Sequence, residues 1–239
     1  MQLCLVIMCG PNDADFLRLH LPVIAPAFDG IVAVVDPADA SHATTLAILA
    51  LCPDHARLTM VRRTFDHDWS AQVNAGIEAA EREGYDAAIR LDPDELMFPA
   101  EIDALRRRIE ASPVSLWFHR YNFFFDRLHY NTGAFPDFQG RAFMLNRGVR
   151  YVGRVHEQIP GDGSLDAATI YHYGDIGPNV KRRQLHYINI ERRNQGLLPF
   201  ATLPHDTPPP SVAVAEFTAE QPLDPFVIGT IAPFVDEVR

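Results

Sequence analysis

Hydrophobic residues in the first half of the chain form short apolar runs separated by amphipathic segments. Residues 3–8 and 30–35 are continuous apolar runs, which is the pattern of strands covered on both faces. Shorter runs at 58–61 and 85–91 predict two more strands. Helical periodicity fills the intervals, over 13–26 (ending near Pro22 or Pro26), 42–51, 70–83 and 101–110. This alternation predicts an α/β fold with a mainly parallel, Rossmann-like sheet flanked by helices.

Polar turns follow three of the predicted strands. Gly10 to Asn12 follows the first, Asp36 the second and Asp92-Pro93-Asp94-Glu95 the fourth. Ligands of parallel sheets bind outside the carboxyl ends of the strands, so we expect a binding site at this edge. We also expect Asp13 to cap the first helix and Gly84 to end the third.

The second half of the chain has a different pattern. Four segments are strand-like, at 114–125, 141–145, 151–155 and 169–173. A helix rich in arginine is predicted after them, at 181–194. From residue 199 onward the chain is rich in proline, including the triple proline at 208–210. We therefore predict one domain over 1–198 and an extension over 199–239 that packs on it without regular structure.

Charge and composition exclude several classes of protein. The formal net charge is -10, with 31 acidic against 21 basic side chains, which argues against nucleic acid as the main partner. No apolar run has the length of a transmembrane segment, although the basic stretch at 181–193 leaves peripheral membrane contact open. The three cysteines form no CxxC pair, and the N-terminus has no basic region of a signal peptide. These features predict a cytoplasmic protein with free thiols.

The strand end Asp92-Pro93-Asp94-Glu95 carries the clearest chemical signal. Carboxylates at positions i and i+2 can face one ion, and such hard oxygen ligands suit Mg²⁺ or Mn²⁺. A metal of this kind offsets negative charge on a departing diphosphate. A solvated surface turn would show the same residue types, so the motif alone leaves both interpretations open.

Several segments in the expected order resemble glycosyltransferase family 2, whose members have the GT-A fold. The resemblance covers roughly residues 1 to 195. It begins with a strand ending in Asp36 and continues with Trp-Ser-Ala-Gln-Val-Asn-Ala-Gly-Ile at 69–77 and the acidic motif at 92–95. Gln-Gly-Arg-Ala-Phe-Met-Leu at 139–145 and Gly-Arg-Val-His-Glu at 153–157 resemble one branch of the family, as does His-Tyr-Gly at 172–174.

The resemblance implies a role for each matched residue on the donor side. Asp36 would contact the nucleoside, and Asn74 would lie on the helix beside the donor. Asp92 would lie near the ribose and diphosphate, and Asp94 would bind Mn²⁺ or Mg²⁺ together with Asp92. His172 is a further candidate metal ligand, because a neutral imidazole can complete an oxygen-rich site.

The resemblance also implies a catalytic base and a diphosphate clamp. Glu157 lies in the matched Val-His-Glu segment and is the preferred base for the acceptor hydroxyl, with Asp137 as the alternative. Lys181 or Arg183 would bind the diphosphate. The family often has Gly-Ser-x-Asp after its second strand, whereas this chain has Asp-Pro-Ala-Asp at 36–39, so the donor base stays open.

The function implied is metal-dependent, inverting transfer of a sugar from a nucleotide-diphosphate donor to an acceptor hydroxyl. The acceptor could be a glycan, a lipid-linked sugar, a protein or a small molecule. A sugar nucleotidyltransferase is one alternative, but the turn at 9–13 lacks the glycines and basic residue of its phosphate loop. A catalytically degenerate module that only binds a nucleotide sugar or glycan is another.

Overall fold

The computed structural model describes residues 1–10, 13–37, 43–52, 57–112, 114–125, 129–154, 156–176 and 214–216, with scattered positions between 185 and 204. The chain divides into two compact units. Unit 1 comprises Met1–Arg120 and Phe138–Ile170, and unit 2 comprises Tyr121–Asp137 and Tyr171–Arg239. The domain boundary expected at residue 198 stays a prediction.

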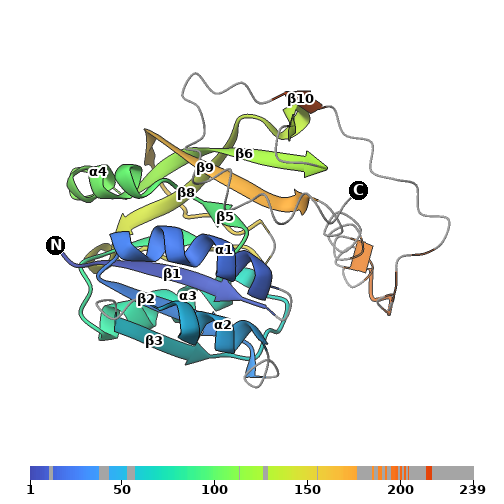
Figure 1. Cartoon of the computed structure of the whole chain (residues 1–239), viewed down its shortest axis with the longest axis horizontal. Coiled ribbons are helices and arrows are strands. Elements are labelled where there is room, and N and C mark those ends of the chain that lie inside the picture. Colours follow the sequence, from blue (N-terminus) through green and yellow to red (C-terminus); the bar gives the residue numbers. More distant parts are fainter. Residues whose placement is uncertain are drawn as a thin grey trace. The chain divides into compact units, whose positions relative to one another are not determined.

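Unit 1 contains the predicted parallel sheet (Figure 1). Its strand order is β4-β1-β2-β3, and every neighbouring pair is parallel. Every residue of β1, β2 and β4 is buried, whereas the edge strand β3 is partly exposed. The four strands predicted from apolar runs are thus confirmed, as Leu3–Cys9 (β1), Gly30–Val35 (β2), Arg57–Arg62 (β3) and Ala87–Leu91 (β4).

Helices cover both faces of this parallel sheet. Figure 1 shows α1 and α2 in front of it and α3 behind it. The bounds are Ala14–Ile24 (α1), Ala43–Leu51 (α2), Trp69–Arg82 (α3) and Pro99–Ile109 (α4), and a short helix, Ala25–Ala27 (η1), follows α1.

The ends of two helices test the sequence analysis. Asp13 occupies the N-cap position of α1, but its carboxylate accepts a hydrogen bond from the Gly10 amide instead of a helix amide. The same helix continues through Pro22 and ends at Ile24, between the two prolines near which its end was expected. Gly84 has φ +81° directly after α3, as expected for a glycine that ends a helix.

The second half of unit 1 adds antiparallel strands, which makes the fold mixed α/β. Strand β8 (Asp137–Met144) pairs antiparallel with β4, and β6 (Ser115–Phe125) lies beside β8. Strand β9 (Gly163–Ile176) pairs with β6 and with the short β5 (Glu95–Leu96). A short helix, Leu145–Arg147 (η4), follows β8.

The strand predicted over 151–155 is wrong. Val152 forms only an isolated bridge with Gln158, and Gly153 has φ +99°. A left-handed residue cannot continue an extended strand, so the chain folds back on itself here. The resulting loop carries Glu157.

Unit 2 holds a small antiparallel arrangement. Strand β7 (His129–Asn131) pairs with β10 (Val214–Glu216), and Phe123 pairs with Tyr130. The helix Thr132–Ala134 (η3) follows β7. Because β10 lies in the proline-rich tail, the expectation of a tail without regular structure is wrong for these three residues. Much of the predicted helix at 181–194 lies outside the described residues, although Leu185, Ile188, Asn189 and Arg192 are helical.

All three cysteines are free, as expected. Cys4 and Cys9 are buried in β1, and Cys52 is partly exposed. Within the described ranges, no helix is both long and apolar enough to cross a membrane.

Close packing of α3 on the sheet yields a test of the fold. A Cβ atom at Gly76 would lie 2.7 Å from Val6 Cγ1 and 2.9 Å from Val34 Cγ2. We expect Gly76→Ala to lower the free energy of unfolding by about 1–3 kcal/mol through overpacking, offset in part by the better helix propensity of alanine. Urea unfolding followed by circular dichroism measures this difference.

The matched control is Glu78→Ala, an exposed position on the same helix, which should change stability by no more than about 0.5 kcal/mol. A Gly76→Ala variant as stable as the wild type would show that α3 does not pack this closely on β1 and β2.

Candidate functional site

The acidic turn Asp92 to Glu95 lies at the carboxyl end of β4 and is held from several sides. The Glu95 amide donates to the Asp92 carbonyl at 2.9 Å, and the Asp92 amide donates to Glu95 Oε2 at 2.9 Å. His20 of α1 is buried, and its Nδ1 lies 2.9 Å from the Pro93 carbonyl oxygen. The turn is therefore fixed by its own residues and by a helix, unlike a freely solvated surface turn.

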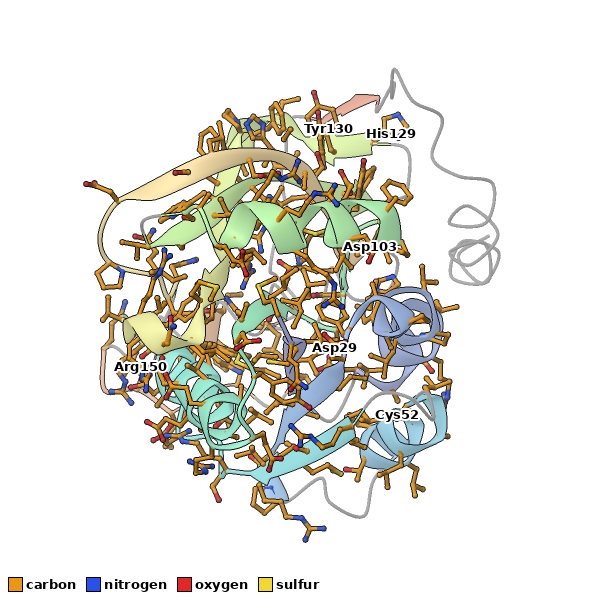
Figure 2. The ribbon with its side chains drawn as sticks, turned by 90° about the vertical axis from the view of Figure 1, so that its left-hand side faces the viewer. Asp29, Cys52, Asp103, His129, Tyr130 and Arg150 are labelled. Carbon is orange, nitrogen blue, oxygen red and sulfur yellow. The ribbon has the colours of Figure 1, made fainter. Side chains whose placement is uncertain are left out.

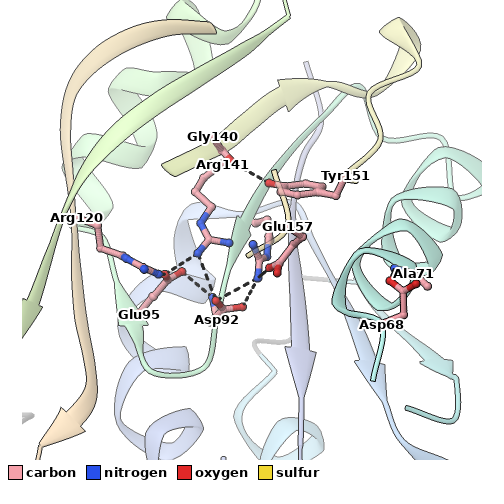
Figure 3. A network of polar contacts seen from close by, with 10 residues as sticks. Asp68, Ala71, Asp92, Glu95, Arg120, Gly140, Arg141, Tyr151 and Glu157 are labelled. Carbon is pink, nitrogen blue, oxygen red and sulfur yellow. Dashed lines mark hydrogen bonds and ion pairs between the residues drawn. The ribbon is translucent and has the colours of Figure 1, made fainter. Parts of the chain in front are cut away.

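Glu95 is fully buried and satisfied by two arginines. Its Oε1 accepts from Arg141 Nη2 at 2.7 Å and from Arg120 Nη1 at 2.9 Å. Arg141 comes from β8 and Arg120 from β6 (Figure 3). A buried carboxylate needs such partners, because an unpaired charge in the interior is strongly destabilising.

Asp92 lies between two guanidinium groups. Arg90 Nη2 lies 2.9 Å and 3.2 Å from its two carboxylate oxygens, and Arg141 Nη2 lies 3.3 Å from Oδ2. Burial, together with the nearby carboxylates of Glu95, Asp94 and Glu157, raises the pKa of Asp92 to about 8, against the lowering effect of Arg90. The carboxylate thus sits in a strongly charged, poorly solvated environment.

Glu157 reaches the same arginine from a distant segment. Its Oε1 lies 2.6 Å from Arg90 Nη2, and its side chain is only 11% exposed. Reciprocal backbone hydrogen bonds between Val152 and Gln158 close the loop that carries it. The Arg154 carbonyl accepts from the Trp69 amide at 3.1 Å, which ties this loop to the start of α3.

Asn74 of α3 anchors the beginning of the same loop. Its Nδ2 donates to the Tyr151 carbonyl at 2.9 Å, and its Oδ1 accepts from the Tyr151 amide at 2.9 Å. The Tyr151 ring in turn lies against the guanidinium of Arg90, with 5.3 Å between the Arg90 Cζ atom and the ring centroid. The contacts of Asn74 therefore position the Glu157 loop.

The network contains equal numbers of basic and acidic side chains. Three arginines (Arg90, Arg120 and Arg141) pair with three acidic residues (Asp92, Glu95 and Glu157). Figure 3 shows Arg120 and Arg141 beside Glu95 and Asp92. Among the described residues, Arg90 Nε and the Nε and Nη1 atoms of Arg141 are buried without a hydrogen-bond partner. Buried donors rarely lack an acceptor, so an oxygen-bearing ligand or water is expected beside them.

The other residues singled out in the sequence are distributed over both units. Asp36 follows β2, is partly buried and accepts from the Phe65 amide at 3.0 Å. Asp137 accepts from Asn122 Nδ2 at 2.9 Å, and His172 is 3% exposed in β9, both in unit 2. Lys181 and Arg183 lie outside the described residues.

The fit of a divalent metal differs between the two aspartates. Among the described residues, no group of three or more His, Cys, Asp or Glu side chains has a metal-site arrangement. Asp92 is already paired with two arginines. Asp94 lies on the same turn and is partly exposed. Mg²⁺ commonly uses only one or two protein carboxylates and completes its shell with phosphate oxygens and water, a pattern that Asp94 fits better than Asp92.

No role was predicted for Arg90, Arg120 or His20, and Arg141 was predicted only as part of a matched segment. The sequence does contain a signal for Arg90, which is the charged residue of an otherwise apolar strand. A charge at a buried strand position must be paired. The partners could not be identified, because they come from segments far apart in the chain.

Comparisons with known proteins give only distant similarities. No family model and no curated protein matches the sequence. By structure, the chain is similar to S. aureus TarS residues 1–349 in complex with UDP-GlcNAc, with 12% identity and a TM-score of 0.48 over 81% of this chain and 67% of that one. Against a longer TarS chain the match covers 40% of that chain, with 11% identity and a TM-score of 0.47.

A second similarity is to 4-diphosphocytidyl-2C-methyl-D-erythritol synthase from Anaerococcus prevotii. The identity is 14% and the TM-score 0.38, over 61% of this chain and 70% of that one. Similarities this distant assign neither a family nor an activity to the chain.

The buried network yields a stability test. We expect Arg141→Met to lower the free energy of unfolding by about 3–5 kcal/mol, because Glu95 loses one partner in a fully buried position. In the double variant Arg141→Met/Glu95→Gln, part of that loss should be recovered. Urea unfolding measures all three proteins.

The control is Arg150→Met. Arg150 (Figure 2) pairs with Glu81 at 2.7 Å and 2.9 Å. Both side chains are partly exposed, so the expected cost is about 0–1 kcal/mol. Equal costs for Arg141→Met and Arg150→Met would contradict the network's role in the core.

Proposed function

We propose that this chain transfers a sugar from a nucleotide-diphosphate donor to an acceptor hydroxyl, with inversion and with a divalent metal. The observation that carries the proposal is the gathering of Asp92, Asp94 and Glu157 at the carboxyl end of β4. Asp36 follows β2 at the same edge, because β2, β1 and β4 are parallel and in register. This is the edge at which open α/β sheets bind ligands.

On the donor side, the proposal assigns one role to each aspartate. Asp36 contacts the nucleoside and Asp92 lies beside the ribose and diphosphate. Asp94 would hold Mn²⁺ or Mg²⁺, and His172, which belongs to unit 2, stays a predicted further ligand. When bound, the metal offsets negative charge on the leaving diphosphate. The buried N–H groups of Arg90 and Arg141 that have no hydrogen-bond acceptor support an oxygen-rich ligand near this turn.

On the acceptor side, Glu157 is the proposed general base. It takes the proton of the acceptor hydroxyl as that oxygen attacks the anomeric carbon, and the bond from this carbon to the diphosphate oxygen breaks. The nucleoside diphosphate leaves with the bonding electron pair. Arg90 Nη2 lies 2.6 Å from Glu157 Oε1 and fixes the position of this carboxylate. Asp137 remains the alternative base.

A ligand screen tests the donor site. UDP, GDP, CDP, TDP and their sugars are compared by thermal shift, with and without Mn²⁺. A ligand present at about 100 times its Kd should raise Tm by about 5 °C or more. We expect a metal-dependent shift for one nucleotide, which Asp94→Asn abolishes.

Asp103→Asn is the matched control, because Asp103 is an exposed aspartate of α4 (Figure 2) and should leave the shift unchanged. No shift with any nucleotide would overturn the donor-site assignment. Release of pyrophosphate from a nucleoside triphosphate and a sugar 1-phosphate would instead identify a nucleotidyltransferase.

A pair of conservative variants tests the base. Glu157→Gln should lower kcat by about 100-fold to 10,000-fold while donor binding is retained, since general base catalysis contributes on that order. Asp137→Asn should leave kcat within a few fold. Steady-state assays of nucleoside diphosphate release measure both. A large loss of kcat in Asp137→Asn but not in Glu157→Gln would assign the general base to Asp137. An unchanged kcat in both variants would exclude both carboxylates as the general base.

A further inference from the structure

Alternate side chains of β9 differ in their exposure. Along β9, Asp166 and Ala168 are buried, and Asp166 pairs with Arg108 of α4 at 2.9 Å. The intervening Leu165 is 58% exposed, and Ala167 is also exposed. Because successive strand residues point to opposite faces, α4 covers one face of β9, and Leu165 and Ala167 lie on the other, exposed face.

Trp117 of β6 lies across this open face. A Cβ atom at Gly163 of β9 would lie 1.9 Å from Trp117 Cδ1 and Nε1, and one at Gly140 of β8 would lie 3.1 Å from Trp117 Cε2. The indole therefore occupies space that side chains would fill on both neighbouring strands. Glycine at these two positions lets the ring lie close to the backbone of both strands, and Trp117 is partly exposed.

The surroundings of Trp117 make this surface aromatic and uncharged. The indole Nε1 donates to Ser115 Oγ at 2.9 Å, and Ser115 is fully buried, so the polar edge of the ring already has a partner. Phe138 of β8 is 43% exposed, and its ring lies 4.8 Å from that of His119, edge to face. We call Trp117, His119, Phe138 and Leu165 the aromatic platform.

We propose that the aromatic platform binds a neutral oligosaccharide. The axial C–H groups on one side of a pyranose ring form an apolar plane that packs on an aromatic face, while its hydroxyls stay at the rim. None of the four side chains carries a carboxylate, ammonium or guanidinium group, which favours an uncharged ligand. A stable protein interface needs roughly 20–30 residues a side, far more than this platform offers.

This site is distinct from the proposed donor site. Gly140 contributes to the aromatic platform, whereas the next residue along β8, Arg141, points to the opposite face and joins Glu95 and Asp92. Binding at the platform requires neither a nucleotide nor a metal. An experiment can therefore reject oligosaccharide binding at the platform without rejecting the proposed transfer reaction, and the reverse.

The test uses the fluorescence of Trp117 in the full chain. The protein has two tryptophans, so Trp69→Phe leaves Trp117 as the single reporter. Maltooligosaccharides, cellooligosaccharides and chitooligosaccharides are titrated without nucleotide or metal. We expect a saturable change in emission with one of these classes, and a Kd that does not depend on Mn²⁺ or on Asp94.

Calorimetry on matched variants checks the site. Trp117→Ala should weaken binding by about tenfold or more, and Trp117→Phe should retain part of the affinity. Leu46→Ala removes an exposed apolar side chain from α2 and should leave Kd unchanged. Circular dichroism and Tm establish that each variant is folded.

Two results would overturn the proposal. One is the absence of a saturable signal with any of the three oligosaccharide classes. The other is binding that Trp117→Ala leaves unchanged. A concentration-dependent molar mass that Trp117→Ala abolishes, without sugar binding, would show that a second copy of the chain covers this face instead.

Discussion

The candidate site depends on how the sheet accommodates two arginines on neighbouring strands. The antiparallel register of β4 and β8 pairs Ala88 with Phe143 and Ile89 with Ala142, and its continuation places Arg90 beside Arg141. Two like charges opposite each other in a buried sheet are unfavourable unless carboxylates lie between them. Asp92, Glu95 and Glu157 supply those carboxylates, so the fold and the geometry of the acidic turn are stabilised by the same ion pairs.

This arrangement has a consequence for chemistry at the turn. Glu95 is fully buried and fixes the turn, whereas Asp92, Asp94 and Glu157 retain some exposure. Groups held by packing and ion pairs before a ligand arrives need little reorganisation when charge develops during a reaction. Hydrogen bonds between Asn74 and the Tyr151 backbone fix the loop that carries Glu157. Asn74 on α3 therefore helps to position a carboxylate that lies more than 80 residues later in the chain.

The parallel half of the fold could be predicted from the sequence, because strands such as β1 are apolar throughout and a glycine with positive φ ends α3 at Gly84. The segment at 151–155 was misassigned because its alternating residues resemble a strand, while Gly153 turns the backbone away. The acidic turn was recognised as a candidate site. Its arginine partners were not, since ion pairing between Arg90 and Glu157 joins residues from segments that no local pattern connects. The same limit applies to Trp117, whose position depends on glycines of two other strands.

The central claim is that this site cleaves the bond between a sugar and a nucleoside diphosphate. The most direct test is to incubate the protein with nucleotide sugars and Mn²⁺ in water labelled with heavy oxygen, and to follow the products by phosphorus NMR and mass spectrometry. Slow hydrolysis by glycosyl transfer to water should release an unlabelled nucleoside diphosphate and a labelled sugar. Release of a nucleoside monophosphate and a sugar 1-phosphate, with the label on phosphorus, would contradict the account.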